Sequence, residues 1–312
     1  MNWKIKAKVQ NTVALLPASF SYAVYYWLQR SFGNLRGVNP VDRLAAATEI
    51  CRRIAKQAES PVGKVFLEIG TGRRINMPIA FWLMGAEKVI SVDSNPYLKQ
   101  ELVSEDVSWI SSNQGEIRRL LGDFLQQERW QLFADFASKR FRLPDLMQLC
   151  NIEYIAPGDA AQLPVASDSV DFHVSYTVLE HIPPKTLESI FVEGNRVVKK
   201  EGLFIHRIDY SDHFSHSDRS ISPINFLQYN DEQWKKLAGN RYMYMNRLRV
   251  DDLEELIQDC GQEILEIDSD TDARIADLIR DRHLILDEKF KDKPLAALST
   301  TASWITSRRS GV

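Results

Sequence analysis

The chain has 312 residues, of which 44% are hydrophobic and 26% are charged, and its formal net charge is -3. This charge balance gives no support for a nucleic-acid partner, and the length suffices for one elaborated domain or for a domain with appendages. The three cysteines, Cys51, Cys150 and Cys260, lie far apart and match no metal-binding or redox spacing, so they fit a reducing compartment such as the cytoplasm.

The first 60 residues differ in composition from the rest of the chain. Five basic residues and no acidic residue precede Asp42, and residues 11–29 carry no charge. Pro17 and the aromatics around Trp27 argue against a signal peptide or a membrane-spanning helix. Two interpretations remain. We favour a helical cover packed on the main domain over an interfacial segment that contacts an anionic membrane and makes the protein peripheral to its inner face.

The segment 64–93 organises the remainder of the chain. It begins with an apolar run that has the length of a buried parallel strand, and this run continues directly into Gly70, Thr71 and Gly72. A helical stretch follows, and then a second apolar run that ends at Asp93. Glycines at such a turn let a nucleoside lie against the backbone, and an acid after the second strand can accept hydrogen bonds from both ribose hydroxyls.

Two departures from the dinucleotide-binding fingerprint indicate the kind of nucleoside. Ile75 stands where the fingerprint requires its third glycine. Glu68 precedes the glycines, where an anion opposes a pyrophosphate but suits a ligand ammonium group. Both departures favour a nucleoside that carries positive charge, and S-adenosylmethionine (SAM) is the obvious candidate.

Here the chain resembles the class I SAM-dependent methyltransferases. Residues 68–72 look like the first motif of that family and residues 89–93 look like the second. The resemblance implies these cofactor-binding residues: Glu68, Gly70, Thr71, Gly72, Asp93, Ser94, Asp159, Ala160 and Tyr176. In the family, an acid after the third strand typically contacts the adenine amine, and Asp159 matches that position. Arg73 and Arg74 depart from the smaller or aromatic residues expected after the glycines, which affects the rim of the cofactor pocket.

Alternating strands and helices predict an α/β fold with a doubly wound, mostly parallel sheet of seven strands. The strands expected after the first two are residues 152–155, 170–175, 203–208, 263–267 and 299–307, the last one antiparallel. We divide the chain into an N-terminal helical cover, 1–60, and a SAM-dependent methyltransferase domain, 61–312. Residues 97–150 are too many for an ordinary crossover, and we interpret them as a helical insertion that either caps the substrate cleft or is purely structural.

Methyl transfer from a sulfonium is an in-line displacement, for which one well-placed base suffices. The densest polar group follows the fifth strand, where open α/β sheets bind ligands, and the catalytic candidates are His213, His181, His206 and Asp209. In the favoured interpretation His213, or else His181, is a general base. In a second, His206, Asp209 and His213 bind a divalent metal that lowers the pKa of the acceptor hydroxyl. In a third, these residues only fix the loop by hydrogen bonds.

Four further residues are expected to contact the methyl acceptor: Glu180, His216, Arg247 and Arg249. Glu180 belongs to the segment that, in the resembling family, lines the methyl-donor cleft. Paired arginines near a cleft can hold an anionic or polyhydroxylated substrate through forked donors. The plainer alternative is that the arginines form salt bridges with Asp251 or Asp252.

A narrower resemblance is to the methyltransferases of bacterial cell-surface glycan clusters. It is carried by Leu15-Leu16-Pro17, Tyr25-Tyr26, Gln29-Arg30, Gly70-Thr71-Gly72, Pro78, Gly85-Ala86, residues 212–216 and residues 246–249. It implies O-methylation of a hydroxyl on a sugar or glycan-type acceptor, including a lipid-linked glycan. The alternatives are N- or C-methylation of a small metabolite, or a non-catalytic SAM-binding subunit that supports a partner enzyme. The sequence leaves the acceptor and the oligomeric state open.

Overall fold

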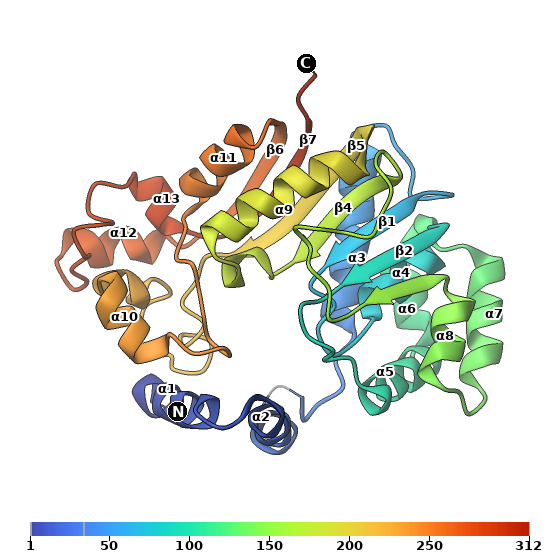
Figure 1. The fold of residues 1–312 in the computed structure, drawn as a ribbon, viewed down its shortest axis with the longest axis horizontal. Helices are drawn as coiled ribbons and strands as arrows, with labels where there is room; N and C mark the ends of the chain where they lie inside the picture. The colour runs from blue at the N-terminus through green and yellow to red at the C-terminus, as the bar shows by residue number, and fades with distance from the viewer. Residues whose placement is uncertain (1, 34, 312) are drawn as a thin grey trace.

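The computed structural model describes residues 2–33 and 35–311, which form one seven-stranded sheet flanked by helices (Figure 1). The strands are β1 (Val65–Ile69), β2 (Lys88–Val92), β3 (Ile152–Ile155), β4 (Val170–Tyr176), β5 (Val198–Asp209), β6 (Gln262–Thr271) and β7 (Thr300–Arg309). Their order in the sheet is β3-β2-β1-β4-β5-β7-β6. Strand β7 runs antiparallel to both of its neighbours, whereas the other pairs are parallel. The predicted doubly wound sheet is confirmed.

Helices cover both faces of this sheet. They are α1 (Trp3–Ala14), α2 (Ala18–Phe32), α3 (Val41–Lys56), α4 (Asn76–Leu83), α5 (Gln100–Ser112), α6 (Gln114–Leu121), α7 (Gln127–Ala137), α8 (Leu143–Leu149), α9 (Pro184–Val197), α10 (Asp231–Ala238), α11 (Val250–Asp259), α12 (Ala273–Arg280) and α13 (Leu295–Ser299), with the short 3-10 helices η1 (Gly122–Phe124), η2 (Leu179–His181) and η3 (Asn225–Gln228). Side chains alternate between the faces of a strand. On β1, Phe66 therefore packs with α3 and α4, while Leu67 and Ile69 pack on the opposite face with α9.

Strand β5 begins at Val198, five residues before the predicted start at Leu203. Helix α9 ends at Val197, so the chain enters the sheet directly, and its register against β4 shifts between Val170 and Phe172. Gly202 lies in this irregular start, where a Cβ atom would be 2.6 Å from the backbone oxygen of Asp171. The apolar pattern of the strand does not predict this early start, because it depends on a local irregularity.

The segment 97–150 forms four helices, α5 to α8, between β2 and β3. Trp130, Phe133 and Leu146 are buried in the same hydrophobic core as α3 and α4. Most of this segment therefore extends one face of the sheet beyond β2 and β3, as Figure 1 shows. Helix α5 contacts α2 through side chains, since Glu101 accepts from Tyr26 and Glu105 forms an ion pair with Arg30.

Helices α1 and α2 lie across the carboxyl edge of the parallel strands, between α10 and α5 (Figure 1). Trp3 of α1 packs with Phe214 and Trp234 in a separate core that also includes α10 and α12. On α2, the hydroxyl of Tyr26 donates to Glu101 at 2.7 Å. Within residues 2–33 and 35–311, every helix is too short or too polar to span a membrane.

Candidate functional site

The glycine loop after β1 is held by the acid after β2. Gly70 and Gly72 have positive φ angles of 86° and 71°, which residues with a Cβ rarely adopt. The backbone N–H of Gly72 donates to Asp93 Oδ2 at 2.7 Å, and the N–H of Asn95 donates to Oδ1 at 2.9 Å. Burial raises the pKa of Asp93, and these two hydrogen bonds partly offset that effect. The predicted turn and carboxylate therefore meet.

Glu68 lies in β1, just before this loop, and only 5% of its surface is exposed. It accepts a hydrogen bond from Ser91, whose hydroxyl also lies 2.6 Å from that of Thr71. Burial raises the pKa of Glu68 to about 7, although Ser91 and the charge of Arg43 pull it down. Glu68, Thr71 and Gly72 line a cavity of about 210 Å³, which is the first part of the candidate site.

Arg43 on α3 is a member of the site that sequence reasoning missed. Its guanidinium donates to the backbone oxygen of Tyr176 at 2.8 Å and lies 4.8 Å from the centre of the Tyr176 ring. Burial raises the pKa of both Glu68 and Glu180, and the positive charge of Arg43 opposes this rise. Arg43 therefore links the glycine loop to the segment after β4. No motif surrounds it, because it is one arginine on an ordinary amphipathic helix.

The other expected cofactor residues lie on the neighbouring loops. The backbone oxygen of Asp93 accepts a hydrogen bond from Gly158 at 2.8 Å, which places Asp159 beside the loop after β2. Asp159 is exposed and accepts from the N–H of Ala161, whereas Ala160 is buried. Ser94 is exposed, and Tyr176 ends β4. Glu68 thus lies in β1, whereas Asp93 and Asp159 follow β2 and β3, and these three strands are adjacent in the sheet.

Neither arginine after the glycines leaves its charge unpaired. Arg73 lies between two aromatic rings, 5.1 Å from the centre of Tyr26 and 5.0 Å from the centre of Tyr97. Arg74 forms an ion pair with the fully buried Asp106. Both residues nevertheless line the cavity next to Glu68, so they form its rim, as their sequence positions indicate.

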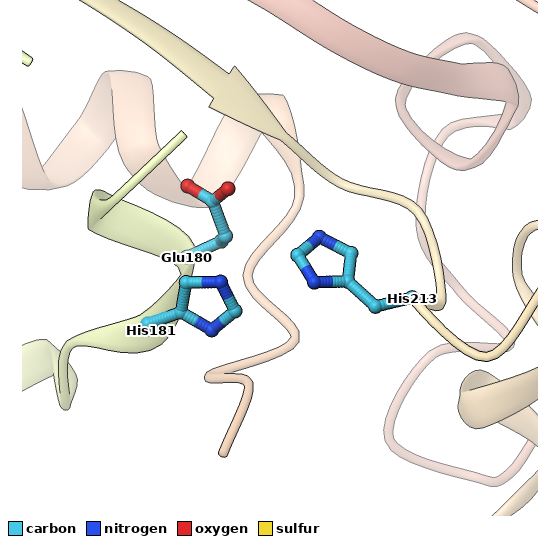
Figure 2. Close-up of side chains that lie close together, drawn as sticks. All are labelled: Glu180, His181 and His213. Carbon is cyan, nitrogen blue, oxygen red and sulfur yellow. The ribbon is translucent and has the colours of Figure 1, made fainter. Parts of the chain in front are cut away.

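A second group of side chains lies beyond β4 and β5. Glu180 and His181 come from η2, and His213 comes from the loop after β5. Ligand atoms of these three residues lie within 4.8 Å of one another. Figure 2 shows the Glu180 carboxylate above the His181 ring and the His213 ring beside them, and the two imidazole rings have an edge-on arrangement with centroids 4.9 Å apart. We call this group the Glu-His-His cluster.

Within this cluster, Glu180 is the most unusual side chain. It is 3% exposed, and neither carboxylate oxygen forms a hydrogen bond of normal geometry with any described residue. Burial raises the pKa of Glu180 well above its ordinary value, while the backbone N–H groups of Glu180 and Asp209 act in the opposite direction. A buried carboxyl without close partners is costly, so a structure that retains one usually uses it.

One ring nitrogen of each histidine in the cluster lies near an oxygen atom, but only that of His181 forms a hydrogen bond with a described residue. Nδ1 of His181 lies 2.8 Å from the backbone oxygen of Tyr244, and Nε2 of His213 lies 3.4 Å from Asp209 Oδ2. His181 is exposed at its edge, but desolvation of its ring and the neighbouring His213 lower its pKa to about 4. Burial raises the pKa of Asp209, but the nearby His213 ring and the hydrogen bonds from Ser211 outweigh this effect and bring the value to about 2. Asp209 is therefore a carboxylate that supports His213.

His206 does not join this cluster, and the prediction that it is catalytic or a metal ligand is wrong. Its side chain is fully buried, its Nδ1 lies 2.8 Å from the hydroxyl of Ser175, and its ring packs against Phe191 of α9. Burial lowers the pKa of His206 well below its ordinary value. His206 and Asp209 are three residues apart on β5, so alternation turns their side chains to opposite faces of the sheet.

Arg247 and Arg249 are also structural in this chain. The Arg249 side chain is fully buried and donates to the backbone oxygens of Tyr210, Ala297, Leu298 and Thr300. Arg247 is 5% exposed, donates to the oxygens of Phe226 and Tyr229, and pairs with Asp231. The prediction that they bind the acceptor is wrong, because their donors are used inside the protein. The expected side-chain salt bridges to Asp251 and Asp252 are wrong as well, since Lys293 pairs with both.

A larger cavity of about 960 Å³ lies between the loop after β5 and the segment around α12, and its lining residues do not include Glu180, His181 or His213. Ser211 and His216 form part of its wall, and their side chains lie 2.9 Å apart. Ser211 also donates to Asp209 at 2.6 Å. Its other polar lining residues include Ser215, Ser220, Ser222, Asn225, Gln228 and Arg274. The cavity therefore offers hydroxyl, amide, guanidinium and carboxylate groups, and it reaches Asp209 through Ser211.

A family model for a methyltransferase domain matches residues 114–206, from α6 into β5. A search of the curated proteins finds no significant match. Among solved structures, a protein of Pyrococcus horikoshii aligns with TM-score 0.50 and 12% identity, over 92% of this chain and 98% of that one. A SAM-dependent methyltransferase of Mesorhizobium loti gives 0.42 and 13%, over 85% and 100%. Magnesium protoporphyrin IX methyltransferase of Synechocystis PCC 6803, solved with bound SAH, gives 0.46 and 11%, over 99% and 100%.

The order of strands with an antiparallel β7 defines the class I methyltransferase fold. The family match adds the activity to this fold, although it begins after the glycine loop and covers β3, β4 and most of β5. The match over residues 114–206 accordingly identifies the chain as an enzyme, a methyltransferase.

Proposed function

We propose that this enzyme O-methylates a hydroxyl of a sugar or glycan-type acceptor, with His213 as the general base. The observation that carries the proposal is the pair of His213 and Asp209, which are 3.4 Å apart, with Ser211 joining Asp209 to the polar cavity. A histidine whose second ring nitrogen faces a carboxylate can take up a proton from a bound hydroxyl and be stabilised as an imidazolium. The resemblance to enzymes of cell-surface glycan clusters supplies the acceptor class.

In this proposal, SAM lies against the glycine loop. Asp93 accepts hydrogen bonds from the ribose hydroxyls, Glu68 attracts the ammonium group of the methionine part, and Asp159 contacts the adenine amine. The remaining cofactor contacts are made by Gly70, Thr71, Gly72, Ser94, Ala160 and Tyr176. The 2.7 Å hydrogen bond between Gly72 and Asp93 supports this arrangement, since it already brings the loop and the acid together.

The proposed chemistry is a single displacement. The acceptor oxygen attacks the methyl carbon in line with the carbon–sulfur bond, whose electron pair remains on sulfur as S-adenosylhomocysteine forms. The hydroxyl proton passes to Nδ1 of His213, while Asp209 faces Nε2 and balances the new positive charge. His181 is a weaker candidate for this role, because desolvation lowers its pKa to about 4.

The acceptor is proposed to enter from the cavity of about 960 Å³. Its serine, asparagine and glutamine side chains suit a ligand with many hydroxyl groups, as each can donate or accept a hydrogen bond. His216 stands at the boundary between this cavity and Asp209, 3.6 Å from the Asp209 carboxylate. His216 and Glu180 therefore remain the proposed acceptor contacts, in place of Arg247 and Arg249.

We also propose that α1 and α2 touch an anionic membrane while they cover the site. Large apolar side chains are exposed along them: Ile5, Val9, Leu15, Phe20, Trp27 and Phe32. Lys4 and Lys8 are exposed on the same helices, and no acidic residue occurs before Asp42. Such a surface fits an interfacial location, where a lipid-linked acceptor would be found. Phe20→Ser with Trp27→Ser should reduce flotation with anionic liposomes, and equal flotation would contradict this contact.

The base is tested with purified enzyme, labelled SAM and an extract of cell-surface glycans. His213→Ala should lower kcat by about 10²–10⁴-fold with SAM affinity unchanged, and added imidazole should restore part of the rate. Asp209→Asn should shift the pH profile of the same reaction. A His213→Ala enzyme with full activity would contradict the base, and a methyl group found on nitrogen or carbon would contradict O-methylation.

A further inference from the structure

We propose that Glu180, His181 and His213 form a binding site for one divalent transition-metal ion of the zinc class. Their ligand atoms lie within 4.8 Å of one another, so small side-chain movements bring all three to one ion. Two imidazoles and one carboxylate are a donor set that suits Zn²⁺ and related ions rather than Mg²⁺ or Ca²⁺, which prefer oxygen. This set differs from the metal alternative considered from the sequence, which comprised His206, Asp209 and His213 and was not favoured.

The unpaired carboxylate of Glu180 is the strongest sign of a ligand. Only 3% of the surface of Glu180 is exposed, and both carboxylate oxygens lack a hydrogen-bond partner of normal geometry among the described residues. Figure 2 shows the Glu180 carboxylate above the His181 ring, with the His213 ring to one side. A bound cation would compensate the cost of burying this charge and would hold the carboxyl in its ionised form.

The surroundings of the two histidines match the outer shell of a metal centre. Histidine ligands usually donate a hydrogen bond from their second ring nitrogen to a carboxylate or a backbone oxygen, and this bond fixes the tautomer and the ring orientation. Here Nδ1 of His181 lies 2.8 Å from the oxygen of Tyr244, and Nε2 of His213 lies 3.4 Å from Asp209. Nε2 of His181 and Nδ1 of His213 remain, and they are on the ring edges that face each other in Figure 2.

Metal binding and base catalysis then compete for the same atom. An ion held by Nδ1 of His213 occupies the lone pair that would accept the proton of the acceptor hydroxyl. Occupancy by Zn²⁺ should therefore stop methyl transfer, and a chelator should restore it. This consequence rests on the proposed function of His213, whereas metal binding itself rests only on the geometry of the cluster.

Binding is measured on the full chain after removal of metal with a chelator. Co²⁺ should bind with one equivalent and give the visible absorption of a site with nitrogen and oxygen ligands, and Zn²⁺ should displace it. Glu180→Gln, His181→Ala and His213→Ala should each weaken Zn²⁺ binding at least about 10-fold. Asp209→Asn, which removes an outer partner, should weaken it by about 10–100-fold. His283→Ala is the matched control, because His283 is exposed and outside the cluster.

Thermal melting without metal separates a lost ligand from a lost fold. Each variant should melt as the unmodified protein does without metal, and only the unmodified protein and His283→Ala should gain stability when Zn²⁺ is added. Unchanged Zn²⁺ affinity in both His181→Ala and His213→Ala, or no bound metal in the unmodified chain, would overturn the site. Tight Zn²⁺ binding without inhibition would leave the site standing and would contradict His213 as the base.

Discussion

Gly70 and Gly72 differ in the space that surrounds them, and alanine substitution at each position can measure this difference. Both have positive φ angles, 86° and 71°, so alanine at either position strains the backbone. A Cβ on Gly70 would lie closer than 3.0 Å to both methyl groups of Val178, whereas a Cβ on Gly72 would meet no described atom within 4 Å. Gly72→Ala therefore adds strain alone, and Gly70→Ala adds strain and a clash.

The two effects have different expected sizes. The left-handed backbone costs a residue with a Cβ about 1–2 kcal/mol. Overpacking a closed site adds about 1–3 kcal/mol. The free energy of unfolding should thus fall by about 1–2 kcal/mol in Gly72→Ala and by about 2–5 kcal/mol in Gly70→Ala. Val178→Ala removes these two methyl groups. Adding it to Gly70→Ala should therefore relieve the clash and regain the stability lost to it, but should not relieve the backbone strain.

Urea unfolding, followed by circular dichroism, gives these free energies for the single and double variants. The coupling between the Gly70 and Val178 substitutions should be favourable by about 1–3 kcal/mol, and the coupling between Gly72 and Val178 should be near zero. SAM calorimetry on the same proteins reports whether the loop still receives the cofactor. Equal losses in Gly70→Ala and Gly72→Ala, or no rescue by Val178→Ala, would refute the reasoning.

Two further predictions concern buried charged groups. The pKa of Glu68 is about 7 in the folded protein and 4.5 ordinarily, so the free energy of unfolding should decrease as pH rises between these values, since the unfolded carboxyl ionises first. Over the same pH range the affinity for SAM should increase, because the carboxylate attracts the cationic cofactor. Urea unfolding measures the first trend and calorimetry the second, and both should vanish in Glu68→Gln. Arg249→Ala should lower the free energy of unfolding by about 3 kcal/mol or more, because several backbone oxygens lose their donor. Thermal melting measures that loss. A variant of normal stability with a raised KM for the acceptor would instead show that Arg249 binds the substrate.

The glycine loop and the strands were predictable because their signals are local. An apolar run followed by Gly70 and Gly72 requires only the residues of one turn, and Asp93 follows the next strand directly. Two parallel strands that pair bring their carboxyl ends together whatever lies between them. The meeting of Asp93 with the N–H of Gly72 therefore follows from topology.

The cluster beyond β4 and β5 was predictable only in part. Histidines crowd the loop after the fifth strand, and both His181 and His213 were singled out, but the role of Glu180 depends on its burial without a partner. His206 was misjudged because its position near the strand end outweighed the alternation that turns it toward α9. Arg249 was misjudged because its partners are backbone oxygens far along the chain, which leave no pattern in the sequence.

The most direct test of the account is the affinity of the folded protein for SAM, measured by calorimetry with the unmodified chain and with Asp93→Ala. The account predicts one bound SAM and a loss of about 10–100-fold in Asp93→Ala, the worth of hydrogen bonds from ribose hydroxyls to a charged carboxylate. Unchanged SAM affinity in a folded Asp93→Ala protein would contradict the placement of the cofactor across the glycine loop.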